Sequence, residues 1–443
     1  MSDSLANLPG FLQPAAPAVT VPGRELPKAA STALIVATFV LCTIHITPFA
    51  DLQSVKNIEV WDGGSLYTQA AYSLLFLAAL AAMAVIGFHR LRPLAHPVNL
   101  ILAGWILVSI VFSQAPVASA RRLALTFICI FLGAILILVA RSVRHFARTL
   151  ALTAFWILVL SYLSLLFAPN YAMHTTLDLR EPDLAGDWRG PFNHKNEAGG
   201  VMAMFIFVGL LAYGTGTRLL GAVVVVASAV FLFFTHSKTA TALVPLVVLQ
   251  VALARSITAT LPRVIVLLSP ALLLALVSLG SFFFKPVQQI LSTYMSDTTF
   301  TGRTEIWEFA LDNILRHPLT GWGYGGFWRT EGTQYGTAGV QQWLTQVDQA
   351  HNSYLDTALF MGFPGLVLTL LAFVVMPIRD LQNGVGGRRM DAATMYFVSV
   401  WVYVLCSCFF ETLLFEGNGA LFILFMTSVF ALRYRTMLPT AMR

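Results

Sequence analysis

Long apolar runs separated by short polar segments extend over almost the whole chain. Most of the runs have about 17–25 residues, the length that an α-helix needs to cross a bilayer, whereas β-barrel strands give alternating segments of about ten residues. Because a bilayer offers no water to backbone N–H and C=O groups, such runs must satisfy their hydrogen bonds within helices. The pattern therefore predicts an all-α, polytopic membrane protein.

Twelve candidate spans are found where an apolar run is bounded by charged residues, proline or glycine. They cover residues 32–50, 67–88, 94–112, 121–141, 147–168, 196–213, 217–234, 240–254, 262–284, 352–376, 392–410 and 418–434. The chain then divides into a tail at 1–31, helices 1–9 within 32–284, a large outer loop at 285–351, helices 10–12 within 352–434 and a second tail at 435–443. The first tail carries five prolines and lacks the basic start and apolar core of a cleaved signal, so we expect it to be disordered.

The composition excludes a soluble protein and gives an orientation. Of the 443 residues 57% are hydrophobic and 11% are charged, against about 25% charged in an ordinary soluble domain. If both termini are cytoplasmic, 16 of the 27 Lys and Arg residues lie on the cytoplasmic side, as the positive-inside rule requires. These residues are Arg24, Lys28, Arg90, Arg92, Arg141, Arg144, Arg148, Arg218, Arg255, Arg263, Arg379, Arg388, Arg389, Arg433, Arg435 and Arg443. The net charge of +6 is therefore a topological signal, and no nucleic-acid partner is expected.

Two outer segments are long, 169–195 and 285–351. In the second, residues 304–315 carry an apolar stripe at helical spacing, followed by His317-Pro318. The stripe predicts an amphipathic helix on the outer membrane boundary, where it serves as an interfacial anchor or as part of a site. The glycines of 321–326 predict tight turns in a packed loop, since glycine tolerates positive φ and close approach.

Outer basic residues are the candidate chemistry, because the positive-inside tendency disfavours them near span ends. They are Arg121, Arg122, Arg189, Lys195, Lys238, Arg303, Arg316 and Arg329. Several of them could converge on one anionic ligand, and a lipid-linked phosphate or pyrophosphate at the membrane surface suits such a cluster. The alternative is pairing with outer carboxylates. His351 and His194 are candidate proton acceptors, with helix capping as the alternative.

Other chemistries have no support in the sequence. No P-loop, HExxH, GxSxG or Asp-rich cation motif is present, so neither a metal nor a cofactor is expected. The four cysteines, Cys42, Cys129, Cys406 and Cys408, all fall inside predicted spans and lack CxxC spacing. We expect them to pack as small apolar residues.

Four outer stretches resemble the O-antigen ligase and polymerase superfamily, and more closely its ExoQ-like exopolysaccharide polymerases. The stretches are 189–196 (RGPFNHKN), 237–239 (SKT), 302–307 (GRTEIW) with 318–323 (PLTGWG), and 351–355 (HNSYL) followed by Gly362 and Gly365. Their order, with a large loop between the last two, carries a resemblance that covers most of the chain. Lys238 stands where ligases generally carry arginine, which favours the polymerase branch.

The resemblance implies a GT-C-like bundle of about twelve transmembrane helices with a large periplasmic loop. It implies a metal-independent, inverting glycosyltransferase at the periplasmic face of a bacterial inner membrane, with an undecaprenyl-diphosphate-linked oligosaccharide as donor and a glycan as acceptor. Chain-length regulator and export proteins are implied as partners. The expected function is polymerisation of repeat units into exopolysaccharide. A ligase that transfers glycan to lipid A core or protein is the alternative within the enzyme class.

The resemblance also assigns roles to residues. Arg189, Lys238 and Arg303 would bind the donor pyrophosphate, and Arg303 and His351 would be catalytic, with His351 as the base. The supporting residues are His194, Lys195, Asn196, Asp348 and Asn352. Asp348 would orient the His351 imidazole if a helix extends that far.

A lipid-linked oligosaccharide flippase or other transporter is the alternative from a different class, since twelve spans are also typical of transporters. Transporters usually place charges near the middle of the bilayer. Here nearly every charge lies at a span end or in a loop, with Glu411 and Glu416 as the nearest exceptions.

Overall fold

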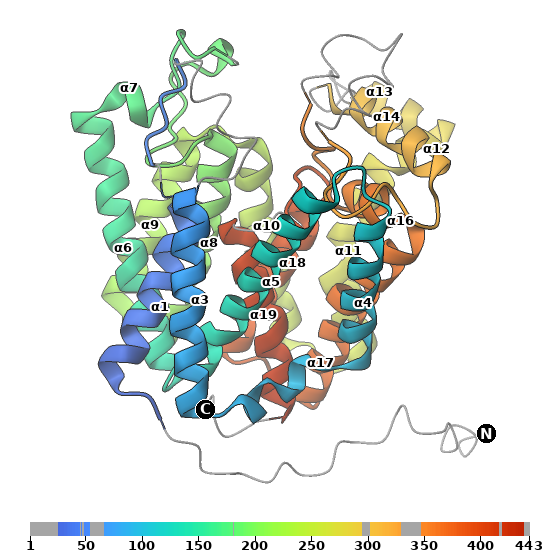
Figure 1. Cartoon of the computed structure of the whole chain (residues 1–443). Helices are drawn as coiled ribbons and strands as arrows, with labels where there is room; N and C mark the ends of the chain where they lie inside the picture. Colours follow the sequence, from blue (N-terminus) through green and yellow to red (C-terminus); the bar gives the residue numbers. More distant parts are fainter. Residues whose placement is uncertain are drawn as a thin grey trace, which may run out of the picture.

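The computed structural model describes residues 25–44, 46, 48–53, 66–179, 181–294, 302–328, 347–415 and 419–437. Within these residues the chain is a bundle of helices that run roughly side by side (Figure 1), and the only β contact is an isolated bridge between Met173 and Trp188. The predicted all-α class is confirmed. Most of both predicted tails lies outside the described residues, together with Arg329 and Glu416.

Every predicted span corresponds to a helix among the described residues. These helices are α1 (Lys28–Thr43), α3 (Leu66–Ile86), α4 (Pro97–Val111), α5 (Pro116–Leu138), α6 (Val143–Phe167), α8 (Lys195–Gly214), α9 (Arg218–Phe234), α10 (Lys238–Ser256), α11 (Thr260–Ser278), α16 (Ser353–Leu370), α18 (Ala392–Ser407) and α19 (Ala420–Met437). The first of them begins at Lys28, so the predicted tail at 1–31 extends too far by four residues.

The number of membrane crossings stays a prediction. In the part of the chain that the structure describes, seven helices are long and apolar enough to cross a membrane. An eighth is added if the bent pair of the 3-10 helix η2 (Phe88–Leu94) and α4, which meet at 83°, counts as one span. The chain is therefore a polytopic membrane protein. Helices α1, α9 and α18 are also apolar, but they are shorter than these candidate spans.

The centre of the bundle is formed by α8, of which 78% of the membrane window is buried. Helices α8 and α9 approach closely at two glycines. A Cβ built on Gly209 would lie 2.8 Å from the carbonyl oxygen of Gly221, and one built on Gly221 would lie 2.5 Å from the Gly209 oxygen. Small residues at such crossings are the usual means by which membrane helices pack. By contrast, only 11% of the window of α11 is buried, as expected for a helix that faces lipid.

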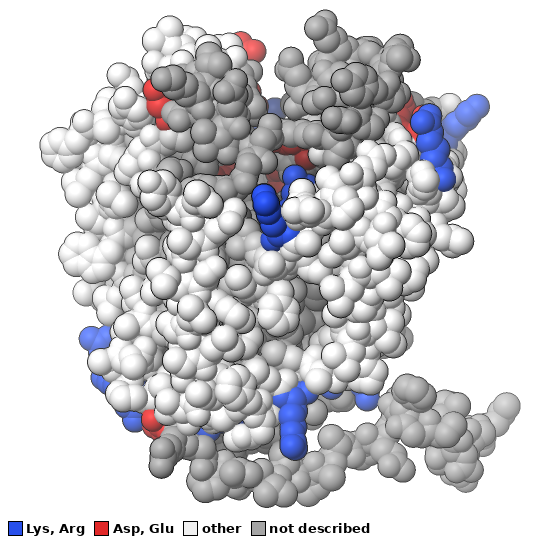
Figure 2. Space-filling view, in the orientation of Figure 1, with Lys and Arg blue, Asp and Glu red and all other residues white. Residues whose placement is uncertain are grey.

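The two long loops lie at the same end of the bundle. Helix α7 (Pro169–Ala172), α13 (Lys285–Tyr294) and α14 (Arg303–Arg316) are all at the upper end in Figure 1, whereas α1 begins and α19 ends at the lower end. Figure 2 shows basic side chains at the lower end and both basic and acidic ones toward the upper end, with a largely uncharged belt between them. The orientation of the bundle in the membrane stays a prediction.

Helix α14 has the predicted position but a different environment. It ends at Arg316, directly before His317-Pro318. Its stripe packs into the protein rather than at the lipid boundary, because α14 lies against α16 and Trp307 is 1% exposed, with its indole Nε1 donating to the Ala350 carbonyl at 2.9 Å. The expectation of a membrane-boundary anchor is therefore wrong for the central part of the stripe.

The glycine-rich loop after α14 is tightly packed, as predicted. Gly321 and Gly323 have φ values of +63° and +91°, which only glycine adopts without strain. A Cβ on Gly323 would lie 2.3 Å from the Ser113 Cα, at the end of α4. The loop is thus fixed against α4. Tyr324, also in the loop, joins it to α5 through a 2.7 Å hydroxyl contact with Thr126.

Candidate active site

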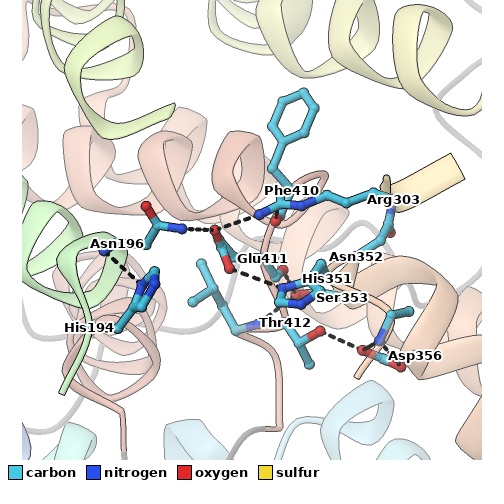
Figure 3. Close-up of polar contacts among 12 residues, drawn as sticks. His194, Asn196, Arg303, His351, Asn352, Ser353, Asp356, Phe410, Glu411 and Thr412 are labelled. Atoms are coloured by element: carbon cyan, nitrogen blue, oxygen red, sulfur yellow. Dashed lines mark hydrogen bonds and ion pairs between the residues drawn. The ribbon is translucent and has the colours of Figure 1, made fainter. Parts of the chain in front are cut away.

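Glu411 lies at the centre of a polar cluster at the upper end of the bundle, in the loop between α18 and α19 (Figure 3). Its Oε1 accepts hydrogen bonds from Arg303 Nη2 at 3.2 Å and from Asn196 Nδ2 at 3.4 Å. Its Oε2 faces His351 Nδ1 at 3.6 Å. One carboxylate therefore connects residues from α8, α14 and the segment before α16.

Arg303 reaches Glu411 from the first turn of α14. Gly302 precedes it with φ +80°, a conformation that turns the chain sharply into the helix. One guanidinium nitrogen donates to the Phe410 carbonyl and the other to Glu411. Since a guanidinium carries five N–H donors, these two contacts leave others to bind an anion.

His351 has an unusual backbone conformation. Its φ is +49°, which is uncommon for a residue other than glycine and is typical of functional sites. The side chain is 32% exposed, so the imidazole is open to a substrate on one side while Glu411 covers the other.

The first residues of α16 hold the Glu411 loop in place. Asn352 is fully buried and is the N-cap of α16, with Oδ1 accepting from Tyr354 N at 3.1 Å and Nδ2 donating to the Phe409 carbonyl at 3.3 Å. Ser353 Oγ donates to the Glu411 carbonyl at 2.8 Å and accepts from Leu413 N at 2.7 Å. Asn352 therefore supports the site as a cap and tether.

Electrostatics keep Glu411 ionised. Partial burial by itself would raise the pKa of the carboxyl group, but the His351 contact and the Arg303 charge outweigh it and hold the pKa below its usual range. A permanent carboxylate beside an imidazole can fix the tautomer of that imidazole, and a neighbouring guanidinium can bind an anion.

Arg189 does not join this cluster. It is 1% exposed, and its guanidinium donates to the Phe192 carbonyl at 3.0 Å and the Ala50 carbonyl at 2.8 Å. Lys238 is exposed at the first position of α10, and no hydrogen bond or ion pair is recorded for its ammonium among the described residues. The expected convergence of Arg189, Lys238 and Arg303 on one point is therefore not seen, since Arg189 serves as a support for the 172–194 loop.

Three more of the predicted site residues lie at the start of α8, and each has a different partner. His194 is the N-cap of α8, with Nδ1 accepting from Asn196 N at 3.1 Å, while its Nε2 lies 2.9 Å from Glu181 Oε2. Lys195 pairs with Asp187 at 2.6 Å. Asn196 alone of the three reaches Glu411. His194 therefore caps a helix, which is the alternative that the sequence analysis gave to a role as proton acceptor.

The predicted role of Asp348 rests on a helix that is not there. Because Asn352 caps α16 and the helix begins at Ser353, residues 348–351 are not helical, and Asp348 does not share a helical face with His351. The carboxylate recorded facing His351 Nδ1 is that of Glu411. The sequence singled out Glu411 only as one of the two nearest exceptions to the placement of charges at span ends and in loops, and that was the signal that could have identified it.

The arrangement can bind an anion at Arg303 and move a proton at His351. Among the described residues no group of three His, Cys, Asp or Glu side chains could hold a metal ion. The four cysteines, Cys42, Cys129, Cys406 and Cys408, are buried and free, as predicted.

One family model matches part of the chain. The family model for O-antigen ligase matches residues 203–370, a segment that runs from α8 to the end of α16 and contains Lys238, Arg303 and His351. No curated protein matches the chain. Over that segment, which is less than half of the chain, the protein is similar to the O-antigen ligase family, whose members are enzymes of the glycosyltransferase type that act on lipid-linked glycans.

Proposed function

We propose that this protein polymerises undecaprenyl-diphosphate-linked oligosaccharide repeat units into exopolysaccharide at the periplasmic face of a bacterial inner membrane. The observation that carries the proposal is the contact of one carboxylate, Glu411, with both Arg303 and His351. A glycosyl transfer from a lipid diphosphate needs the two groups that this contact joins, a cation for the leaving group and a base for the acceptor.

In the proposed reaction the acceptor hydroxyl attacks the anomeric carbon of the donor sugar. The bond between that carbon and the diphosphate oxygen breaks, and its electron pair leaves with the lipid diphosphate. Arg303 binds the diphosphate more tightly as its charge grows, which is the differential binding that lowers a barrier. Lys238, exposed at the start of α10, is the second proposed diphosphate ligand. The proposal leaves Arg189 as a support, because its guanidinium is engaged by backbone carbonyls.

His351 takes the proton of the acceptor hydroxyl. Because the Glu411 carboxylate faces Nδ1, it favours the tautomer with the proton on Nδ1 and leaves the Nε2 lone pair as the acceptor. Direct displacement from the face opposite the diphosphate inverts the anomeric centre. No metal is required, since the cationic side chains provide the charge that stabilises the leaving group.

A ligase is the second candidate, because the matching family model is described as O-antigen ligase. Ligase and polymerase share the donor chemistry and differ in the hydroxyl that attacks. Lys238, where ligases generally carry arginine, favours the polymerase.

The test is incubation of the purified protein with undecaprenyl-diphosphate-linked oligosaccharide, extracted from cells that lack this protein, followed by sizing of the lipid-linked product. A ladder of longer lipid-linked glycans supports polymerase activity. Products only when lipid A core is added would show a ligase instead. The absence of product under both conditions contradicts glycosyl transfer. His351→Ala is the inactive control.

A further inference from the structure

Asp356 is a buried carboxylate that the proposed reaction does not use. It lies in the first turns of α16 and is 2% exposed. Its oxygens accept from Trp328 Nε1 at 2.7 Å, from Ala350 N at 3.1 and 3.2 Å, and from the Thr412 hydroxyl. Burying a carboxylate costs free energy unless its oxygens are hydrogen-bonded. These three donor groups compensate that cost for Asp356 and fix its position.

Two of these donors are chain neighbours of the proposed catalytic pair. Ala350 directly precedes His351, and Thr412 directly follows Glu411. Asp356 thus connects the segment that carries the base to the loop that carries its carboxylate (Figure 3). These two segments are far apart in the sequence, and the helix that holds Asp356 begins at Ser353, shortly after the base.

The peptide before His351 is held on both sides. Its Ala350 N–H donates to Asp356 and its Ala350 carbonyl accepts from Trp307 Nε1 at 2.9 Å. His351 itself sits at φ +49°, a conformation that persists only where the surroundings enforce it. The Asp356 bonds therefore help to enforce both the backbone of His351 and its separation from Glu411.

We propose that Asp356 is a positioning residue for glycosyl transfer, which sets the His351–Glu411 distance by bonding to the neighbour of each. This inference rests on the proposed function. The distance matters because Nδ1 and Oε2 are 3.6 Å apart, just beyond hydrogen-bonding distance, and the buried Nδ1 has no hydrogen-bond partner among the described residues. A small approach of the two segments would form the hydrogen bond that fixes the imidazole tautomer, and a small displacement apart would prevent it.

Replacing Asp356 by Asn is a weak test, because the Thr412 hydroxyl can accept from the new amide instead of donating. Thr412→Val is sharper, since it removes one bond at nearly constant volume and leaves the side chains of His351, Glu411 and Arg303 unchanged. Thr412→Ser keeps the hydroxyl. The control is Thr427→Val in α19, which makes the same substitution at a more deeply buried threonine and removes a hydroxyl bond, 2.8 Å to the Ile423 carbonyl, away from the site.

The assay is the lipid-linked extension reaction described above, with kcat and KM measured separately and the melting temperature recorded for each variant. We expect Thr412→Val to lower kcat about tenfold with KM unchanged, because a misplaced base weakens the chemical step and not ground-state binding. Thr412→Ser should restore kcat, and Thr427→Val should leave it unchanged. The melting temperature should fall modestly in both valine variants, since each loses a hydroxyl bond.

Three results would overturn the proposal or separate it from the proposed function. Wild-type kcat in Thr412→Val, with His351→Ala inactive, overturns the positioning role and leaves the function standing. A fall in kcat that is matched by Thr427→Val, or that follows the melting temperature, shows a structural role only and also overturns it. Activity in His351→Ala overturns the proposed function itself.

Discussion

Replacing Glu411 by Gln should inactivate the protein by forcing the wrong imidazole tautomer. In the wild type, Oε1 of Glu411 accepts from two donors, Arg303 Nη2 at 3.2 Å and Asn196 Nδ2 at 3.4 Å, while Oε2 faces His351 Nδ1. The Gln oxygen must therefore take the Oε1 position, where both donors need an acceptor. The Gln NH₂ group is then left facing Nδ1.

An amide N–H opposite Nδ1 makes Nδ1 an acceptor, so the imidazole proton moves to Nε2. That nitrogen can then no longer take the proton of the acceptor hydroxyl. Changes of this kind, which keep the geometry but reverse the tautomer, lower kcat by about 10⁴ in a serine protease. Because the contact here is longer, we expect a loss of about 10³, equivalent to about 4 kcal/mol of activation free energy.

The measurement is kcat for extension of undecaprenyl-diphosphate-linked oligosaccharide by the purified variant. Glu181→Gln is the matched control, because Glu181 forms another carboxylate–imidazole pair, with His194 at 2.9 Å, outside the cluster. Its kcat should stay within about twofold of wild type, as for most surface substitutions. A folded Glu411→Gln variant with kcat similar to that control would refute the tautomer argument.

Three further predictions concern binding, packing and pH. Arg303→Lys should lower kcat/KM about 10²-fold in the same assay, because lysine lacks the planar fork that matches phosphate oxygens, and full activity would show that only charge is needed. Gly323→Ala should destabilise the fold by about 1–3 kcal/mol, since its Cβ would lie 2.3 Å from the Ser113 Cα at φ +91°, and an unchanged melting temperature in detergent would contradict the packing. The pKa of Glu411 lies below its ordinary 4.5, because His351 and Arg303 outweigh burial, so its contribution to stability is present above pH 4.5 and is lost as the pH falls through the folded value. Melting temperatures measured at pH about 6 and about 4 should therefore fall more for wild type than for Glu411→Gln, and equal falls would count against that contribution.

Local signals in the sequence were sufficient for most of the fold. The spans follow from apolar runs bounded by charge, Pro or Gly, and each corresponds to a helix among the described residues. The end of α14 at Arg316 follows from the His317-Pro318 pair, since proline cannot continue a helix. The tight turns at Gly321 and Gly323 follow from glycine chemistry. Each of these features depends on residues close together in the chain.

The same signals did not predict what a side chain touches. The stripe of α14 has the pattern of a membrane anchor, yet Trp307 is buried against the protein, because periodicity shows that a face is apolar and not what covers it. Arginine is a residue type that suits a phosphate ligand, yet the Arg189 guanidinium donates its hydrogen bonds to the carbonyls of Phe192 and Ala50.

The sequence by itself determined the class of protein and its helices, and four short stretches indicated Arg303 and His351 as candidate site residues. The tertiary structure decided that Glu411 joins them, although it is 108 residues from Arg303 along the chain. It also decided that Asp348 is not on a helix with His351, because Asn352 caps α16 after both of them. The physical reason is that apolar periodicity and turn chemistry act over a few residues, whereas a polar site is assembled by the packing of helices whose side chains meet only in the folded bundle.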